Sequence, residues 1–185
     1  MIGYLEGSIK HSQKNKVLLF ANGIGFAVHL PENHNLAIGD TASLFIHTHL
    51  RDDDLSLFGF LSAIDLDLFE TLIGVSGVGP KTALNIFSQS SSENIIQAIS
   101  QSNLNFFTSI SGVGKKTAQR IILDLKSKVS KGDIDMKNLE GKSELVDSLI
   151  SLGFQKSELS PIISQIASGE TLASQVKQAL RLLNK

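Results

Sequence analysis

The sequence has 185 residues, with 17 Lys and Arg against 18 Asp and Glu, so its formal net charge at pH 7 is −1. This near-neutral balance argues against a polycation that coats nucleic acid through charge alone. No cysteine is present, which excludes disulfides, thiolate metal sites and a cysteine nucleophile.

Neither export nor membrane insertion is predicted. The first residues, MIGYLEGSIKHSQ, lack the basic segment followed by an apolar segment that marks a secretory signal peptide. No stretch approaches the ~18 apolar residues of a membrane-spanning helix. We therefore expect a cytoplasmic protein that has no membrane partner.

Residues 1–63 have the pattern of short strands separated by glycine bends. Apolar runs at residues 17–20 and 26–30 flank Asn22-Gly23, and this dipeptide between apolar runs is a strong hairpin signal. Residues 42–49 and 55–60 form a second plausible antiparallel pair. Five short strands of this kind predict a small barrel of the OB type.

Three consecutive carboxylates, Asp52, Asp53 and Asp54, follow Arg51 at the expected tip of the second hairpin. A run of charge at a turn is most often a solvated turn. The alternatives are a negatively charged pin, or ligands and acid–base groups of a catalytic site. Metal sites usually gather ligands from several segments, and no second acidic cluster is evident, so catalysis is the weakest alternative.

All five histidines, at positions 11, 29, 34, 47 and 49, fall in this N-terminal block. His47 and His49 share one face of a strand because side chains alternate with a period of two. A third ligand is not apparent, so we favour structural histidines and predict no metal site.

From residue 62 the apolar period changes from that of a strand to that of a helix. Residues 64–73 predict one helix, and Pro80 suits the first position of the next. Ser92 is expected to cap a third helix. Residues 103–110 lead into a last amphipathic helix that runs from Lys115 to about Val129.

The helical block contains one phrase twice, SGVGPKTALNI at residues 76–86 and SGVGKKTAQRI at residues 111–121. Such self-similarity indicates one structural unit used twice. In each copy an apolar helix is followed by a Gly-x-Gly turn and a second helix. Glycine lets backbone N–H groups approach a ligand, and the next helix directs its positive end to the same place, which suits phosphate.

Two tight turns without a ligand are the plain alternative, but a turn by itself needs neither Lys nor Thr. The spacing of a P-loop is missing, and no strand precedes either copy, so neither nucleotide-binding fingerprint fits. The phrase resembles the helix-hairpin-helix motif, which grips DNA backbone without reading sequence. The predicted phosphate contacts are Gly77, Val78, Gly79, Lys81 and Thr82 in the first copy, and Gly112, Val113, Gly114, Lys115, Lys116 and Thr117 in the second.

The rest of the chain predicts a linker and a small third domain. Residues 131–142 are polar and lack a period, so we expect a flexible linker. Residues 143–185 contain three apolar helical segments that predict a small bundle. The sequence Leu152-Gly153-Phe154 resembles the ubiquitin-associated fold, and we expect Leu149, Leu152 and Phe154 to form a partner-binding patch. Ordinary core packing is the alternative for these residues.

The order of these parts resembles the RuvA family from end to end. The resemblance rests on residues 1–3, 23–26 and 57–60, on His49 with the acidic tip, and on the two repeated phrases. It implies a multidomain α+β fold: an OB-like β-barrel, a central all-α tandem of helix-hairpin-helix motifs over residues 64–130, and a three-helix UBA-like bundle on a flexible linker.

The resemblance also implies partners. It implies a bacterial homotetramer, or two tetramers face to face as an octamer, that holds a Holliday (four-way) junction open and square-planar. The C-terminal domain would recruit the hexameric ATPase RuvB for branch migration in recombination and repair. A RuvC-type junction resolvase is a further candidate partner. The chain itself would need no cofactor, because ATP and Mg²⁺ would be used by RuvB.

Within the resemblance the acidic tip becomes a pin. Asp52 and Asp53 match the two adjacent acids of the family, and Asp54 is an added acid. The chain would be a non-catalytic subunit of the RuvAB complex. Two other functions stay open at this point: a general duplex-binding repair scaffold, and a Mg²⁺-dependent junction nuclease.

Overall fold

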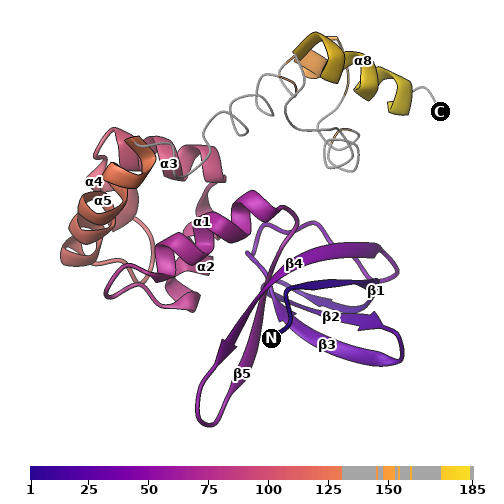
Figure 1. The fold of residues 1–185 in the computed structure, drawn as a ribbon, viewed down its shortest axis with the longest axis horizontal. Coiled ribbons are helices and arrows are strands. Elements are labelled where there is room, and N and C mark those ends of the chain that lie inside the picture. Colours follow the sequence, from indigo (N-terminus) through magenta and orange to yellow (C-terminus); the bar gives the residue numbers. More distant parts are fainter. Residues whose placement is uncertain (131–144, 146–147, 153, 155–158, 160–171, 184–185) are drawn as a thin grey trace. The chain divides into compact units, whose positions relative to one another are not determined.

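The computed structural model describes residues 1–130, 145, 148–152, 154, 159 and 172–183 (Figure 1). The chain divides into two units, residues 1–134 and 135–185, and each is described by itself. The predicted linker at 131–142 lies outside the described residues. Within the described ranges, no helix is long and apolar enough to cross a membrane.

The first unit begins with a closed five-stranded barrel, which confirms the predicted OB-like architecture. Its strands are β1 (Tyr4–Gln13), β2 (Lys16–Ala21), β3 (Ile24–His29), β4 (Thr41–Leu50) and β5 (Leu55–Phe60). They close in the order β1-β2-β3-β5-β4, with β3 and β5 parallel and the other neighbours antiparallel. Alternating apolar side chains fill the barrel: Leu5, Ile9, Val17, Leu19, Val28, Leu30, Ala42, Leu44, Ile46 and Leu57.

Both predicted hairpins are present. Asn22 and Gly23 have φ angles of 49° and 85°, and two consecutive positive φ angles are the signature of the type I′ turn that suits the twist of paired strands. In the second hairpin Leu50 pairs with Leu55, and the Arg51 N–H donates to the Asp54 carbonyl at 2.8 Å. The tip of this hairpin therefore carries Asp52 and Asp53, and it projects away from the barrel (Figure 1).

Five helices follow in the first unit: α1 (Ala63–Ile73), α2 (Pro80–Gln89), α3 (Ser92–Ser100), α4 (Leu104–Thr108) and α5 (Lys115–Ser130). Pro80 opens α2 as expected. The cap predicted at Ser92 is wrong by one residue, because Ser91 caps α3 by accepting a hydrogen bond from Asn94 N–H. Ser92 is instead buried, and its hydroxyl donates to the Asp65 carboxylate of α1.

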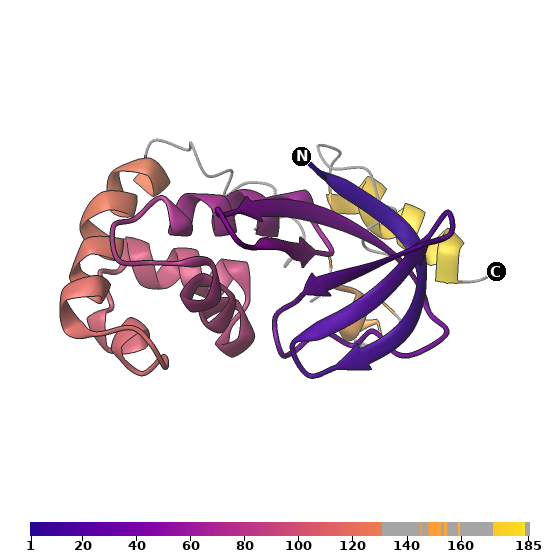
Figure 2. The ribbon, with the colours of Figure 1, turned by 90° about the horizontal axis from the view of Figure 1, so that it is seen from below.

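Aromatic contacts and hydrogen bonds fix the barrel to the helices. Phe58 stacks on Phe69 of α1 with ring centroids 5.6 Å apart. The ring centroids of Phe60 and of Phe87 in α2 are 5.1 Å apart. The Glu32 N–H donates to the Ser88 hydroxyl at 2.8 Å. The two bodies lie side by side in Figure 2. Because Phe58 belongs to β5, these contacts also fix the base of the projecting hairpin relative to the helices.

The second unit has a small apolar core of its own. Leu145, Leu149, Leu159 and Ala179 form its buried centre. Phe154 and several residues of α8 (Leu172–Leu183) pack against them. One of the helical segments predicted within residues 143–185 is therefore present as α8. The predicted count of three helices in this domain rests partly on residues outside the described ranges.

Candidate nucleic-acid interface

The two repeated phrases form matching turns. The Val78 N–H donates to the Val75 carbonyl at 3.0 Å, and the Val113 N–H donates to the Ile110 carbonyl at 3.1 Å. Gly77 and Gly112 have φ angles of 92° and 88°. A positive φ at the third position of a four-residue turn defines type II, which requires glycine there. This requirement explains why the first glycine of each phrase is repeated.

Each turn leads directly into the N-terminus of a helix. The Ala83 N–H donates to the Gly79 carbonyl at 2.9 Å, and the Ala118 N–H donates to the Gly114 carbonyl at 2.9 Å. These are the first intrahelical bonds of α2 and α5, so the N–H groups before them have no partner within their helix. Gly79 also provides no side-chain cap.

All four predicted glycines, Gly77, Gly79, Gly112 and Gly114, are exposed. Within the described part of the chain, no acceptor is bonded to their N–H groups. Exposed N–H groups beside the positive end of a helix form a site for an anion. Both turns therefore lie at the surface, where the predicted phosphate contacts require them.

Two predicted contacts need correction. Val78 and Val113 are each 5 % exposed, and their N–H groups already bond inside the turns. They cannot offer that N–H to a phosphate without opening the turn. Their function in this geometry is to anchor the turns in the helical core.

The two copies contact each other reciprocally. The Arg120 guanidinium of α5 donates to the Ser76 hydroxyl at 3.0 Å, and the Asn85 amide of α2 donates to the Ser111 carbonyl at 3.3 Å. Arg120 and Asn85 occupy the same position of the repeat, as do the two serines. Each helix therefore braces the turn of the other copy. The repeat alignment could have identified Arg120 and Asn85, but sequence reasoning missed both.

The predicted threonines also lie between the copies. A methyl group at Gly77 would stand 3.7 Å from Thr117 Oγ1, and one at Gly112 would stand 3.7 Å from Thr82 Oγ1. Both threonines are half-buried, whereas Lys81, Lys115 and Lys116 are exposed. The threonines thus help to join the two turns, and the lysines supply charge beside them.

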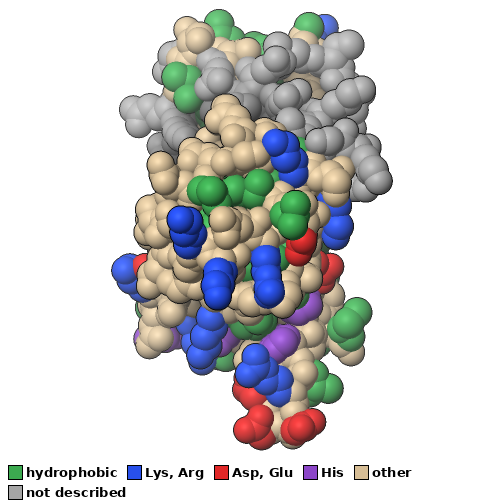
Figure 3. Space-filling model, turned by 90° about the vertical axis from the view of Figure 1, so that its left-hand side faces the viewer, with side chains coloured by type: hydrophobic (Ala, Val, Ile, Leu, Met, Phe, Trp, Pro, Cys, Tyr) green, Lys and Arg blue, Asp and Glu red, His purple; other side chains and the backbone are tan. Residues whose placement is uncertain are grey.

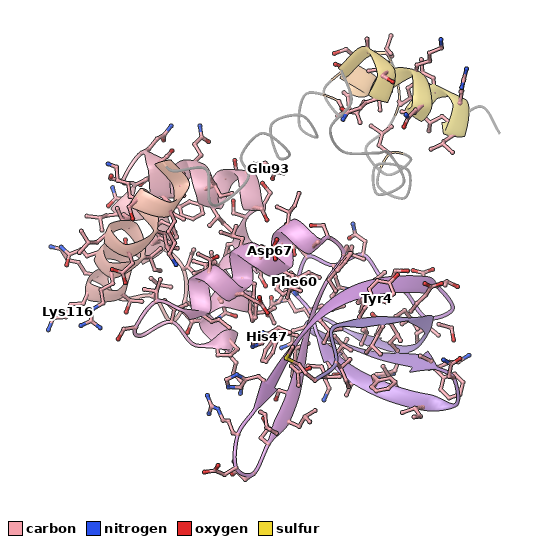
Figure 4. All side chains as sticks on the ribbon, viewed as in Figure 1. Tyr4, His47, Phe60, Asp67, Glu93 and Lys116 are labelled. Carbon is pink, nitrogen blue, oxygen red and sulfur yellow. The ribbon has the colours of Figure 1, made fainter. Side chains whose placement is uncertain are left out.

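On the face shown in Figure 3, several Lys and Arg side chains lie over the helical part of the first unit, and acidic side chains lie at the end of the projecting tip. Lys116 points outward from the helical part, and His47 lies at the base of the hairpin (Figure 4). Asp52, Asp53 and Asp54 are all exposed. The turns and the pin are therefore accessible together.

His29 and His47 have structural partners. His47 Nδ1 lies 2.9 Å from the Glu70 carboxylate, and His29 stacks on Phe58 with ring centroids 5.4 Å apart. Burial lowers the pKa of His29 below its usual 6.5, and the charges of Lys16 and Lys81 lower it further, against a smaller opposite effect of Asp54. Among the described residues, no group of three or more His, Cys, Asp or Glu could hold a metal.

The predicted patch of the second unit is only partly at the surface. Leu149 is 0 % exposed and Leu152 is 59 % exposed, while Phe154 is half-buried against the core. Leu149 therefore packs inside the domain, and the expectation that it contacts a partner is wrong for this fold. Ile150, which is 44 % exposed, is a further exposed apolar residue of this segment that sequence reasoning did not assign to the patch.

Family models match all three parts of the chain. A model described as the RuvA N terminal domain matches residues 1–59. A SAM-like helix-hairpin-helix tandem matches residues 69–127. A model described as RuvA, C-terminal domain matches residues 142–184.

Curated relatives match over the full length. The chain is 39% identical over 99% of its length to a protein of Halothermothrix orenii, of which 97% is covered. It is 35% identical to one of Geobacter sulfurreducens and 38% identical to one of Oenococcus oeni, with 100% of each chain covered. All three relatives are named Holliday junction branch migration complex subunit RuvA.

Proposed function

The chain belongs to the RuvA family, and we propose on this premise that it is a structure-specific, sequence-independent DNA-binding subunit that recognises the four-way junction. The observation that carries the proposal is the braced pair of type II turns, each of which leads into a helix N-terminus. The named relatives, all subunits of a Holliday junction branch migration complex, support the same function.

The turns would bind DNA through its phosphates. Neutral N–H donors at Gly77 and Gly112 position a duplex without reading its sequence. Nearby lysines add charge, so a protein with a net charge of −1 can still bind DNA locally. Because the two turns are braced together, they present two phosphate sites at a fixed separation, as one duplex arm requires.

The acidic pin would give preference for the junction. Its exposed carboxylates repel phosphates, and two unit charges ~4 Å apart interact by about 1 kcal/mol in water. A continuous duplex would have to pass its backbone over the pin. An open junction has a centre into which the pin can project, so the same repulsion would direct the strands outward.

We further propose the assembly and the partners. A fourfold homotetramer would place four pins at the centre and one pair of turns on each arm, and a second tetramer facing the first would form an octamer. The second unit would recruit the RuvB ATPase through the exposed Leu152 and the half-buried Phe154. A RuvC-type resolvase is a candidate for the same junction. Family resemblance and the exposure of these residues support the proposal.

We propose that the chain acts in the bacterial cytoplasm and needs no cofactor of its own. The sequence contains no P-loop spacing, so ATP and Mg²⁺ would act in RuvB. Purified chain incubated with ATP and junction DNA should release no phosphate until RuvB is added. Junction cleavage by the chain with Mg²⁺ would favour a nuclease instead.

A gel-shift comparison tests the main proposal. The full chain is titrated into a labelled four-way junction and into a linear duplex of equal length and composition. We expect tighter binding to the junction at every salt concentration, and both affinities should fall steeply as salt rises, since phosphate contacts release counterions. Equal affinity for the two DNAs would support a general duplex-binding scaffold.

A further inference from the structure

The hairpin of β4 and β5 has an apolar face that continues beyond the barrel. Leu50 and Leu55 are paired across the hairpin, two positions further out than Thr48 and Leu57. Leu57 is 4 % exposed inside the barrel, whereas Leu50 is 72 % and Leu55 is 57 % exposed. Side chains two residues apart lie on the same face of a strand. The face that lines the barrel interior at Leu57 therefore continues outward along the hairpin, where it carries the exposed pair Leu50 and Leu55 below the acidic tip.

The opposite face of the same hairpin is polar and its groups bond to one another. Arg51 Nε donates to His49 Nε2 at 3.0 Å. The Ser56 hydroxyl donates to the Asp54 carboxylate at 2.6 Å. The side chains of Asp52 and Asp53 have no such partner in the described part of the chain. The projecting hairpin therefore combines an acidic end, a polar face that is internally bonded, and an apolar face open to solvent.

The negative charge of the tip determines which part of DNA this apolar face can contact. Asp52 and Asp53 lie within three residues of both leucines, so a phosphate that approached the pair would also approach two carboxylates. Leucine offers no hydrogen-bond donor to a phosphate. The faces of nucleobases are uncharged and apolar, and side chains such as leucine can wedge between base steps and unstack them.

A second copy of the chain fits this face less well. Stable protein–protein interfaces bury about 800 Å² on each partner, and two leucine side chains at a narrow tip cannot provide that area. Bases at the centre of an open junction are small enough to be covered by two leucines, and their uncharged faces are not repelled by the acidic tip.

We propose that Leu50 and Leu55 form a wedge that contacts the faces of the bases at the junction crossover and holds the central pairs unstacked. The acids exclude the backbone from the centre, and the leucines provide an apolar surface to the bases that have lost their stacking partners. This inference rests on the proposed function, because it needs a junction held over the pin.

The experiment uses the full chain and a four-way junction that carries 2-aminopurine at the crossover, where unstacking raises fluorescence. The test variant is Leu50→Thr with Leu55→Thr, which removes the apolar surface and keeps residues that suit a strand. A second variant, Leu50→Met with Leu55→Met, keeps the apolar surface. The control is Ile38→Ser, because Ile38 is a similarly exposed apolar residue at 66 % outside the hairpin.

We expect the Thr variant to bind the junction within about threefold of the unmodified chain, because the braced turns are intact, and to lose at least about half of the fluorescence increase. The Met variant and the Ile38→Ser variant should keep that increase. Full brightening with the Thr variant would overturn the proposal. A lower molecular mass of the Thr variant in sedimentation would also overturn it, since the leucines would then be a subunit contact.

Failure of the proposed function gives a different result. In that case the unmodified chain would show no preference for the junction over linear duplex in the same titration. Preference for the junction with no fluorescence increase at the crossover would leave the proposed function standing and would reject only the wedge.

Discussion

Arg120 of α5 donates a hydrogen bond to the hydroxyl of Ser76, 3.0 Å away in the turn of the other repeat. Asn85 makes the corresponding contact from α2 to Ser111. The two turns that we propose to bind phosphate are thus held by each other's helices, and their separation does not depend on the turns alone. A rigid separation matters because a duplex presents its phosphates at fixed spacing.

Breaking this brace should weaken binding and stability together. We expect Ser76→Ala to lower the free energy of unfolding by about 1 kcal/mol and the junction affinity by about fivefold. Arg120→Lys keeps the charge but loses the planar fork, so it should act in the same direction. Thermal unfolding and gel shifts measure the two effects, and Ser109→Ala serves as an exposed serine control. Wild-type affinity of Ser76→Ala would show that the brace does not position the turns.

The positive φ of the turn glycines should make them intolerant of alanine. Gly77→Ala or Gly112→Ala should cost about 1–2 kcal/mol of stability, because an L-residue is strained in the left-handed region. Gly79→Ala is the matched control, since Gly79 has a φ of −90° and a methyl group there would meet nothing within 4 Å. Chemical denaturation of the three variants compares them directly, and equal stability of all three would contradict the turn assignment.

Neutralising the pin should relax the preference for junctions. Asp52→Asn with Asp53→Asn should raise the affinity for linear duplex by about fivefold, which corresponds to about 1 kcal/mol of charge repulsion. Asp67→Asn, an exposed acid of α1, should leave duplex affinity nearly unchanged. Filter binding at low salt measures all three proteins. An unchanged duplex affinity of the pin variant would mean that the acids do not exclude DNA.

His29 should make the first unit less stable in mild acid. Because burial and two lysines lower its pKa below 6.5 in the folded chain, the unfolded chain binds a proton first as pH falls. His29 therefore does not affect the free energy of unfolding above pH 6.5. As the pH falls from 6.5 to the lower pKa that His29 has in the folded chain, the free energy of unfolding decreases. His29→Gln should reduce this loss, whereas exposed His11→Gln should not. Urea denaturation across this pH range measures the slope, and equal slopes would reject the assignment.

Substitutions in the second unit should distinguish a buried core residue from an exposed surface residue. Leu149→Ala should destabilise that unit by about 2–5 kcal/mol, because it empties a fully buried site. Leu152→Ser should leave stability within about 0.5 kcal/mol and weaken the association with RuvB. Leu123→Ser, an exposed leucine of α5 at 77 %, is the control for the partner measurement. Unchanged RuvB binding of Leu152→Ser would remove Leu152 from the proposed contact.

Local sequence patterns determined much of this protein. The Asn22-Gly23 hairpin, the barrel strands, the start of α2 at Pro80 and the duplicated glycine turns were all predicted, because each depends on a residue's own φ preference or on apolar periodicity. These are properties of a few neighbouring residues, and they survive into the fold wherever the tertiary contacts agree with them.

The tertiary structure determined which hydrogen-bonding groups and apolar side chains are free to bind a ligand or partner. Ser91 caps α3 because Ser92 bonds to Asp65, and Val78 uses its N–H inside its turn. Leu149 looks like Leu152 in the sequence, but only packing shows that one is buried and the other exposed. Sequence therefore told us where donors and apolar residues occur. Whether each is free to bind depends on partners far along the chain, which only the folded arrangement brings into contact.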